Sequence, residues 1–281
     1  MLERARAVRG VALMGVCNVT PDSFSDGGLH LEPAAARARV EVLLAEGADV
    51  VDIGGESTRP GAPPVAAPEQ IARVIGAVRH AAALGACVSI DTSNPEVADS
   101  ALEAGASLVN DASCLADEAL AGVVARHGAA LILMHARGPQ QKMRGFSEYP
   151  DSGYRDVISD VVAEWRAAAR RAADAGVAGE AILMDPGLGF AKNAAQSATL
   201  LARLSEIVRA VEVPVVVGAS RKSFLAAIDP QARPAERLGA SIAAALHAAR
   251  AGAQVLRVHD VRATRQALDL ARRLSSAPGG G

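Results

Sequence analysis

The sequence of 281 residues contains few cysteines and lysines and no apolar run long enough to cross a membrane. Its three cysteines, Cys17, Cys87 and Cys114, are far apart and lack CxxC spacing, which argues against a zinc site or a disulfide framework. Small buried thiols in a reducing compartment explain them better. A bilayer span needs about 18 apolar residues, and the N-terminal segment lacks the apolar core of a secretory signal. We therefore expect a cytoplasmic protein without membrane contact.

The chain also lacks an excess of charge of either sign. Its formal net charge is −2, so no basic field favours nucleic acid. Of its 29 basic residues, only Lys142, Lys192 and Lys222 are lysines. Most lysines are solvated surface groups, so one of these gains weight only within a conspicuous motif. The composition therefore gives no indication of nucleic acid as a partner.

Eight short apolar runs, each carrying a polar residue at or near its end, alternate with Ala-rich stretches of helical character. The runs cover residues 12–18, 48–53, 87–91, 106–110, 130–135, 181–185, 213–222 and 254–259. Strands buried on both faces read as continuous apolar runs, and parallel strands need helical crossovers between them. Eight such units predict an α/β fold, a (β/α)8 TIM barrel of about 250 residues with its active site at the C-terminal ends of the strands.

The segments between the runs predict the helices and loops. Helices are expected at residues 33–46, 68–84, 95–104 and 117–126, and near 196–210, 235–251 and 262–274. A further long helix is expected to pass through Trp165 and end at Asp174. Residues 136–153 are too many for an ordinary turn and form a candidate active-site loop. Residues 19–30 and 55–64, with few apolar anchors, are expected to be mobile in the free protein. We expect one domain over residues 1–281, with its core at about 12–274 and a flexible tail at 275–281.

Polar side chains at neighbouring predicted strand ends suggest a ligand. Asp52, Asp91, Asn110 and Asp185 would converge on the barrel axis. Buried carboxylates are unfavourable unless they are paired or hydrogen-bonded. An amino-pyrimidinone ring would satisfy them, because a carboxylate accepts two parallel hydrogen bonds and an amide both donates and accepts. Lys222 could then face a ring carbonyl or nitrogen. For a single aspartate, a structural network satisfied by backbone N–H groups and water would be the better explanation. Four such residues at neighbouring strand ends favour a ligand instead.

A second group indicates an anion. Arg59, Arg257 and His259 suggest phosphate, since a guanidinium matches phosphate oxygens and TIM barrels commonly bind phosphate near strands seven and eight. Asn18 is well placed to hold a phosphate-bound Mg²⁺, which takes few protein ligands and keeps its waters. The alternative for Arg257 and His259 is helix capping or a surface pair with Asp260.

Several motifs of other chemistries are incomplete. GASRKS lacks the second glycine of a P-loop, and GLGF is too short for a dinucleotide fingerprint. No Ser–His–Asp order or HExxH is present, and a lone His135 is given a supporting role only. With no evident nucleophile, we expect transfer between two bound substrates, driven by positioning and by stabilisation of a leaving anion.

At these residues the sequence resembles the dihydropteroate synthases, folate-pathway enzymes of the pterin-binding barrels. The resemblance covers about residues 14–268 and rests on MGVCNVTPDSFSDGG, VDIGGESTRPGA, VSIDT, VNDAS, LMH, MDPGLGF, VGASRKSF and RVHDV, in this order. Each segment is weak alone, but the ordered set is specific. The resemblance implies a transferase that joins 6-hydroxymethyl-7,8-dihydropterin diphosphate to p-aminobenzoate, releasing pyrophosphate and forming 7,8-dihydropteroate. It also implies Mg²⁺ as cofactor and a homodimer.

The resemblance further implies a role for each matching residue. The catalytic residues would be Asp91, Lys222 and Arg257. The pterin would be bound by Asp91, Asn110, Met134, Asp185, Phe190 and Lys222. The diphosphate would be bound by Asn18, Arg59, Arg257 and His259, with Asn18 also serving Mg²⁺. The p-aminobenzoate would be bound by Phe24, Thr58, Arg59, Pro60, Phe190 and Ser220.

The sequence departs from the family pattern at a few positions. Ala191 and Cys114 stand where glycine is common, Gln196-Ser197 replaces a His-Asn pair, and ARGPQQKM replaces the usual fifth-strand loop. None of these is an implied pterin or diphosphate ligand. Two other functions stay open: a pterin-dependent corrinoid methyltransferase of the same barrel, which needs no diphosphate site, and a non-catalytic pterin-binding paralogue. The aminobenzoate and phosphate segments argue against both.

Overall fold

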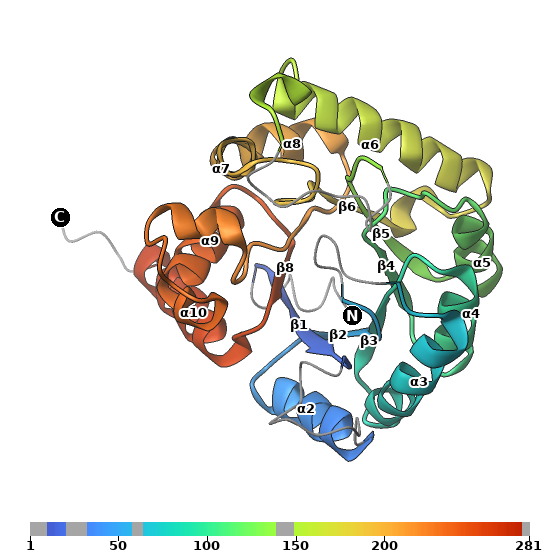
Figure 1. The fold of residues 1–281 in the computed structure, drawn as a ribbon. Helices are drawn as coiled ribbons and strands as arrows, with labels where there is room; N and C mark the ends of the chain where they lie inside the picture. The colour runs from blue at the N-terminus through green and yellow to red at the C-terminus, as the bar shows by residue number, and fades with distance from the viewer. Residues whose placement is uncertain (1–9, 21–32, 58–63, 139–148, 277–281) are drawn as a thin grey trace.

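The computed structural model describes residues 10–20, 33–57, 64–138 and 149–276, in which parallel strands form a central ring inside a ring of helices (Figure 1). The strands are β1 Ala12–Asn18, β2 Val50–Gly54, β3 Cys87–Asp91, β4 Leu108–Asp111, β5 Ala130–Met134, β6 Ile182–Asp185, β7 Val216–Val217 and β8 Val255–Val258. The helices are α2 Pro33–Ala45, α3 Ala67–Ala83, α4 Pro95–Glu103, α5 Ala119–His127, α6 Val157–Asp174, α7 Ala194–Ala202, α8 Leu204–Val211, α9 Leu238–Arg250 and α10 Val261–Ser276.

The eight strands follow the order β6-β5-β4-β3-β2-β1-β8-β7 in one parallel sheet. The two ends of this order meet where Met184 forms a bridge with Val215 and its N–H donates to the carbonyl of Pro214 at 2.9 Å. The sheet is thus a nearly closed barrel, and the (β/α)8 prediction is confirmed. Closure removes the free sheet edges and brings the C-terminal ends of all the strands to one rim.

The inside of the barrel is built in layers because side chains of a strand alternate between its two faces. A lower apolar layer contains Ala12, Met14, Val50, Leu108, Ile132, Leu183, Val216 and Val255. The residue two positions further along several of these strands faces the same way and is polar. This step leads from Val50 to Asp52, from Leu108 to Asn110 and from Val255 to Arg257. A polar layer therefore lies directly above an apolar floor.

The helices cover the outer face of the sheet, and their ends agree with the sequence signals. The Asn94 side chain caps α4 by accepting from the backbone N–H groups of Glu96 and Val97. Pro95 is the first residue of the helix, as expected. Helix α6 begins at the cap Asp156 and buries Trp165, whose indole N–H donates to the carbonyl of Leu133 at 2.9 Å. This hydrogen bond fixes α6 against β5.

The structure differs from the expected boundaries in three places. The expected strand at 213–222 contains only Val216–Val217, because the chain turns after it, where the N–H of Lys222 donates to the carbonyl of Ala219. The expected helix near 196–210 divides at Arg203, whose φ of −100° and ψ of 21° leave the helical region. Helix α10 extends to Ser276, two residues into the expected tail. The remaining tail and most of the two loops predicted to be mobile lie outside the described residues.

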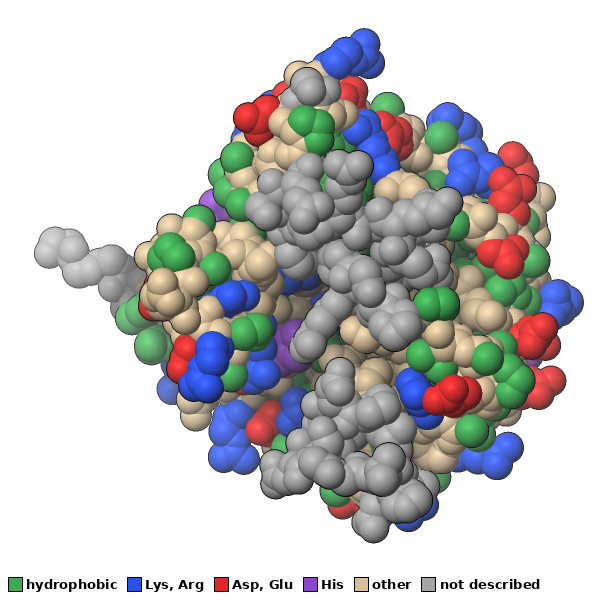
Figure 2. Space-filling view, viewed as in Figure 1, with side chains coloured by type: hydrophobic (Ala, Val, Ile, Leu, Met, Phe, Trp, Pro, Cys, Tyr) green, Lys and Arg blue, Asp and Glu red, His purple; other side chains and the backbone are tan. Residues whose placement is uncertain are grey.

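The thiols and the surface agree with the composition. All three cysteines are free; Cys17 is buried and the other two are half-buried. Burial raises the pKa of the Cys17 thiol to about 12, so it stays protonated. Side chains of both charge signs are scattered around the described part of the face in Figure 2. Within the described ranges, no helix has the length and apolar character needed to cross a bilayer.

Candidate active site

Two buried carboxylates share one guanidinium at the centre of the rim. Arg257 donates from Nε to Asp52 Oδ2 and from Nη2 to Asp91 Oδ2, each at 2.6 Å. Asn110 Nδ2 also donates to Asp52 Oδ2 at 3.2 Å. The sequence predicted this convergence of strand ends, but it assigned Arg257 to the diphosphate and did not foresee its contact with both carboxylates.

The second oxygen of each of these carboxylates is left over. Asp52 Oδ1 and Asp91 Oδ1 are buried and have no hydrogen-bond partner among the residues that the structure describes. An unsatisfied buried acceptor costs about 1–3 kcal/mol, so two of them on one rim mark a place where a ligand's N–H groups can donate. Burial raises the pKa of Asp91 to about 7, although the Arg257 guanidinium opposes this shift.

Across the rim, a carboxylate and an ammonium lie beside an apolar wall. Asp185 Oδ1 accepts from the N–H of Gly187 at 2.7 Å. Lys222 Nζ donates to the carbonyl of Leu188 at 2.5 Å and lies 4.5 Å from the centre of the Phe190 ring. Burial lowers the pKa of Lys222 to about 8, while Asp185 raises it.

The apolar wall itself is small. Met134 and Phe190 form a buried cluster with Ala112 and Ala136, and Cys114 packs against it. Phe190 is placed by the turn that follows β6, and Met134 ends β5. This cluster gives a flat ring an apolar face to lie on, next to the polar groups that would bind its edge.

A third set of groups gathers where β1, β7 and β8 end. The Ser220 hydroxyl accepts from the His259 N–H at 3.2 Å and lies 3.1 Å from His259 Nδ1. Burial first, and then Arg257 and Arg221, lower the pKa of His259 to about 3, so its imidazole is neutral. Without a bound anion, His259 is therefore a neutral hydrogen-bond donor at this corner.

Two further arginines hold this corner. Arg39 Nη2 donates to the carbonyl of His259 at 2.9 Å. Arg221 forms a bidentate pair with Asp260, 3.0 Å from Nε to Oδ2 and 2.5 Å from Nη2 to Oδ1. Asp260 thus pairs with Arg221, and its charge also raises the pKa of His259 against the larger opposing effect of burial. Arg221, which the sequence did not single out, keeps a positive φ of 61° in the turn before Lys222.

The structure brings together most residues that the sequence nominated. Asp91, Asn110, Met134, Asp185, Phe190, Ser220, Lys222, Arg257 and His259 lie at the C-terminal rim of the barrel, and Asn18 ends β1 on the same rim. Phe24, Thr58, Arg59 and Pro60 lie outside the described residues, so their assignment to p-aminobenzoate and diphosphate stays a prediction.

One buried residue was missed. Lys192 has no exposed surface, although it was treated as an ordinary lysine. Its Nζ lies 2.9 Å from Nδ1 of His135, which is equally buried and whose Nε2 contacts Glu164 at 3.0 Å. The supporting role predicted for His135 is consistent with these contacts. The available signal was that Lys192 stands two residues after Phe190, the last residue of the MDPGLGF motif, in a chain with few lysines.

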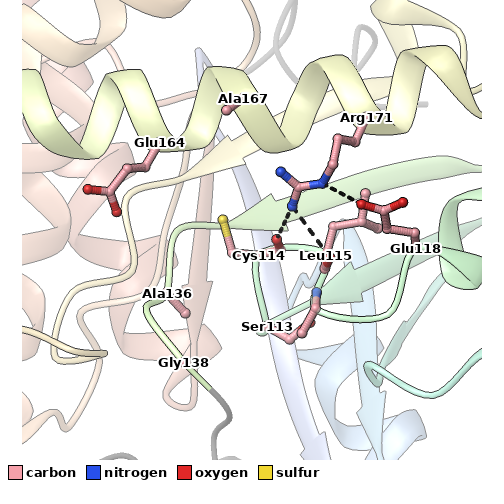
Figure 3. A pocket seen from close by; sticks show the side chains of 10 residues that line it. Ser113, Cys114, Leu115, Glu118, Ala136, Gly138, Glu164, Ala167 and Arg171 are labelled. Carbon is pink, nitrogen blue, oxygen red and sulfur yellow. Dashed lines mark hydrogen bonds and ion pairs between the residues drawn. The ribbon is translucent and has the colours of Figure 1, made fainter.

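A separate hollow of about 510 Å³ lies between α6 and the turn that follows β4 (Figure 3). Arg171 reaches across it from α6, with Nη2 3.2 Å from the carbonyl of Cys114 and Nε 3.0 Å from a carboxylate oxygen of Glu118. The hollow shares Ala136 with the apolar wall but includes none of the rim carboxylates. It is therefore adjacent to the candidate site and distinct from it.

Comparisons with known proteins agree with this geometry. The family model described as pterin binding enzyme matches residues 14–259. The dihydropteroate synthase of Mycobacterium leprae is 44% identical over 264 residues, which cover 92% of this chain and 91% of that protein. The chain belongs to the dihydropteroate synthases. It is therefore an enzyme, a transferase.

Solved structures of the family have the same fold. The dihydropteroate synthase of Xanthomonas albilineans with 4-aminobenzoic acid has a TM-score of 0.87 and 39% identity, covering 95% of this chain and 94% of that one. The same protein in complex with 7,8-dihydropteroate has a TM-score of 0.83 and 37% identity, with 95% of each chain covered. The enzyme thus shares both its barrel and the extent of its chain with these synthases.

Proposed function

We propose that the rim binds 6-hydroxymethyl-7,8-dihydropterin diphosphate and p-aminobenzoate and joins them to 7,8-dihydropteroate, releasing pyrophosphate. The pair of unpartnered carboxylate oxygens beside Arg257 is the observation that carries this proposal. The ligands of the Xanthomonas albilineans structures, 4-aminobenzoic acid and 7,8-dihydropteroate, support it.

The polar layer suits the pterin ring. The amino-pyrimidinone edge carries adjacent N–H donors, and carboxylates such as Asp91 and Asp185 accept them in parallel. Asn110 provides both a donor and an acceptor, and the Lys222 ammonium donates to a ring carbonyl or nitrogen. Phe190 and Met134 supply the apolar surface for the ring face. Each of these groups is already held by backbone or side-chain contacts, so little ordering is needed on binding.

The corner around Ser220 and His259 suits the diphosphate. Arg257 Nη1 makes no hydrogen bond within the described residues, and neutral His259 can donate from Nε2. Asn18 ends β1 at this corner, and within the described chain its side-chain amide makes no hydrogen bond. Arg59 would add a further cation.

The donor set also fits Mg²⁺ held mainly by the substrate. Mg²⁺ prefers oxygen ligands, keeps several waters and is often bound by one or two protein oxygens plus phosphates. Asn18 would supply such an oxygen, and the described residues contain no His, Cys, Asp or Glu cluster that would make a dedicated metal cage. When bound, Mg²⁺ would neutralise charge on the leaving diphosphate.

The chemistry needs no protein nucleophile. The amine nitrogen of p-aminobenzoate forms a bond to the exocyclic methylene carbon, and the bond from that carbon to the diphosphate oxygen breaks with its electron pair leaving on pyrophosphate. The proton lost by the amine passes to solvent. Asp91 and Lys222 hold and polarise the ring, and Arg257 stabilises the departing anion. Ser220 and Phe190 would border the aminobenzoate, together with Phe24, Thr58 and Pro60.

The reaction is tested by incubating the protein with the pterin diphosphate, p-aminobenzoate and Mg²⁺ and detecting dihydropteroate by mass. A methyltransferase or a non-catalytic paralogue would bind the pterin and form no such product. The family assignment and the hydrogen-bond donors that Arg257 and His259 offer an anion disfavour both alternatives. The homodimer and the cytoplasmic location stay predictions, and sedimentation of the purified enzyme checks the first.

A further inference from the structure

Lys192 is a buried lysine whose Nζ lies among neutral hydrogen-bond acceptors. Within the described residues it forms no ion pair, and its Nζ contacts His135 Nδ1 at 2.9 Å, the carbonyl of Phe190 at 2.9 Å and the carbonyl of Gly187 at 3.1 Å. An ammonium has three N–H donors and no acceptor. Its three donors therefore match three short contacts, and a fourth, the carbonyl of His135, is 3.4 Å away.

Two of these acceptors, the carbonyls of Gly187 and Phe190, belong to a turn with an unusual backbone. Gly187, Gly189 and Ala191 have positive φ values of 68°, 76° and 51°. Ala191 keeps a left-handed backbone although its Cβ makes that conformation unfavourable. The turn surrounds the ammonium of Lys192, so removing that ammonium would leave inward-facing carbonyls without a donor.

The other side of Lys192 is anchored to helix α6. The Glu164 carboxylate accepts from His135 Nε2 at 3.0 Å, so the neutral imidazole carries its proton on Nε2 and its Nδ1 accepts from Lys192. Burial first, and then Lys192, lower the pKa of His135 to about 4, which keeps the ring neutral. Arg137 donates from Nε to the same Glu164 oxygen at 2.8 Å. The turn is therefore tied through Lys192 and His135 to a fixed helix.

The same turn carries groups of the candidate site. The carbonyl of Leu188 accepts from Lys222 Nζ at 2.5 Å, and the ring of Phe190 lies beneath that ammonium at 4.5 Å. Lys192 binds the carbonyls of Gly187 and Phe190, and Leu188 lies between these two residues. Any displacement of the turn would move both contacts of Lys222 at once.

We propose that Lys192 is a positioning residue: its buried ammonium fixes the turn at residues 187–190 and so places Phe190 and Lys222 for the pterin ring. This role rests on the proposed function of the rim. Lys192 touches neither the proposed ring edge nor the diphosphate corner, and it acts only through the turn.

The test compares Lys192→Met, which keeps the length of the side chain and removes its donors, with Lys192→Gln, which keeps N–H donors without charge. The control is Trp165→Phe, which removes a buried donor to the same strand β5 at Leu133 without touching the turn. Calorimetry should show that the Met variant binds 6-hydroxymethylpterin at least about tenfold more weakly than wild type. The Gln variant should be intermediate and the control unchanged.

Binding of inorganic pyrophosphate with Mg²⁺ separates positioning from general damage. It should stay within about twofold of wild type in all three variants, because the substituted side chains make no contact with the diphosphate corner and distant sites act independently. Equal losses for both probes in Lys192→Met, or an unchanged affinity for 6-hydroxymethylpterin, would overturn the role of Lys192. If the wild-type protein binds neither probe, the proposed function itself fails and takes this role with it.

A spectroscopic measurement covers the case in which the variants do not fold. Nitrogen-15 NMR of wild-type histidines, with His135 assigned through His135→Gln, should report the neutral tautomer with the proton on Nε2. A resonance pattern with the proton on Nδ1 would show that Lys192 does not donate to the ring, and it would refute the proposal. In folded Lys192→Met the Nδ1 resonance should move toward that of an unbonded ring nitrogen.

Discussion

Replacing Gly187 with alanine tests the turn most directly, because the structure gives the collision. A Cβ built at Gly187 would lie 2.0 Å from the carbonyl oxygen of His135 and 3.2 Å from Nζ of Lys192. The clash would be with a backbone atom, which cannot turn aside as a side chain can. Either the turn or the end of β5 must therefore move by about 1 Å to restore a contact of 3.0 Å. Overpacking of this kind costs about 1–3 kcal/mol.

The left-handed backbone adds a second cost, which a matched control isolates. Gly187 has a φ of 68°, and Gly128, the C-cap of α5, has a φ of 60° with no atom within 4 Å of its would-be Cβ. Gly128→Ala should therefore lose only the conformational term, about 1–2 kcal/mol. Gly187→Ala should lose that term and the overpacking term, about 2–5 kcal/mol in all.

Urea unfolding measures both changes in the free energy of unfolding, and calorimetry measures 6-hydroxymethylpterin binding by the folded variants. We expect Gly187→Ala to weaken binding by about tenfold, since the displaced turn carries Phe190. Gly128→Ala should bind 6-hydroxymethylpterin normally, because Gly128 lies at the C-terminal end of α5, away from the rim. Equal destabilisation by the two substitutions, together with normal binding by Gly187→Ala, would show that the turn is not tightly packed on β5.

Three further predictions address the rim. Asp185→Asn should weaken pterin binding by about tenfold with little loss of folding stability, because an amide leaves one of two ring donors unpaired; calorimetry beside thermal unfolding checks this, and unchanged affinity would remove Asp185 from the pocket. Pterin affinity should be greatest between about pH 7 and 8, because Asp91 gains a proton below about pH 7 and Lys222 loses one above about pH 8. A pH titration checks this: if Asp91→Asn loses affinity below about pH 7 just as wild type does, Asp91 is not the cause. Lys222→Ala should lower the initial rate by at least about tenfold, whereas Lys142→Ala, outside the described residues, should not; equal rates for the two variants would show that the turn after β7 is misassigned.

Most of the barrel could be predicted because its signal is local and repeated. A strand buried on both faces must be apolar along its length, and eight such runs leave few alternative folds. The polar end of each run then identified Asp52, Asp91, Asn110 and Asp185, since strand ends share one rim. Element boundaries were harder to predict: β7 shrank to Val216–Val217 because a turn beginning at Ala219, which apolar composition does not reveal, ends the strand early.

The partners of the charged residues could not be predicted, because they depend on distances across the barrel. Composition alone does not show that Arg257 joins Asp52 to Asp91, since these residues are up to 205 positions apart in the chain. Lys192 was missed for a related reason. Its three acceptors are a ring nitrogen and two carbonyls, and carbonyls carry no sequence signal. A buried lysine is recognisable from sequence only when its partner is an acid at a suggestive spacing.

The arrangement of Arg257 has a consequence for how the two halves of the substrate are coupled. With Nε on Asp52 and Nη2 on Asp91, the guanidinium is held in a fixed plane, and within the described residues its Nη1 makes no hydrogen bond and is available to another acceptor. The carboxylates keep their Oδ1 atoms for a ring, so binding the pterin need not displace the arginine. The same guanidinium then fixes the carboxylates that hold the ring and offers its remaining donors to the diphosphate. A ring that binds correctly would thus position its own leaving group against a cation that is already oriented, and the enzyme would lose little free energy to reorganisation as the carbon–oxygen bond breaks.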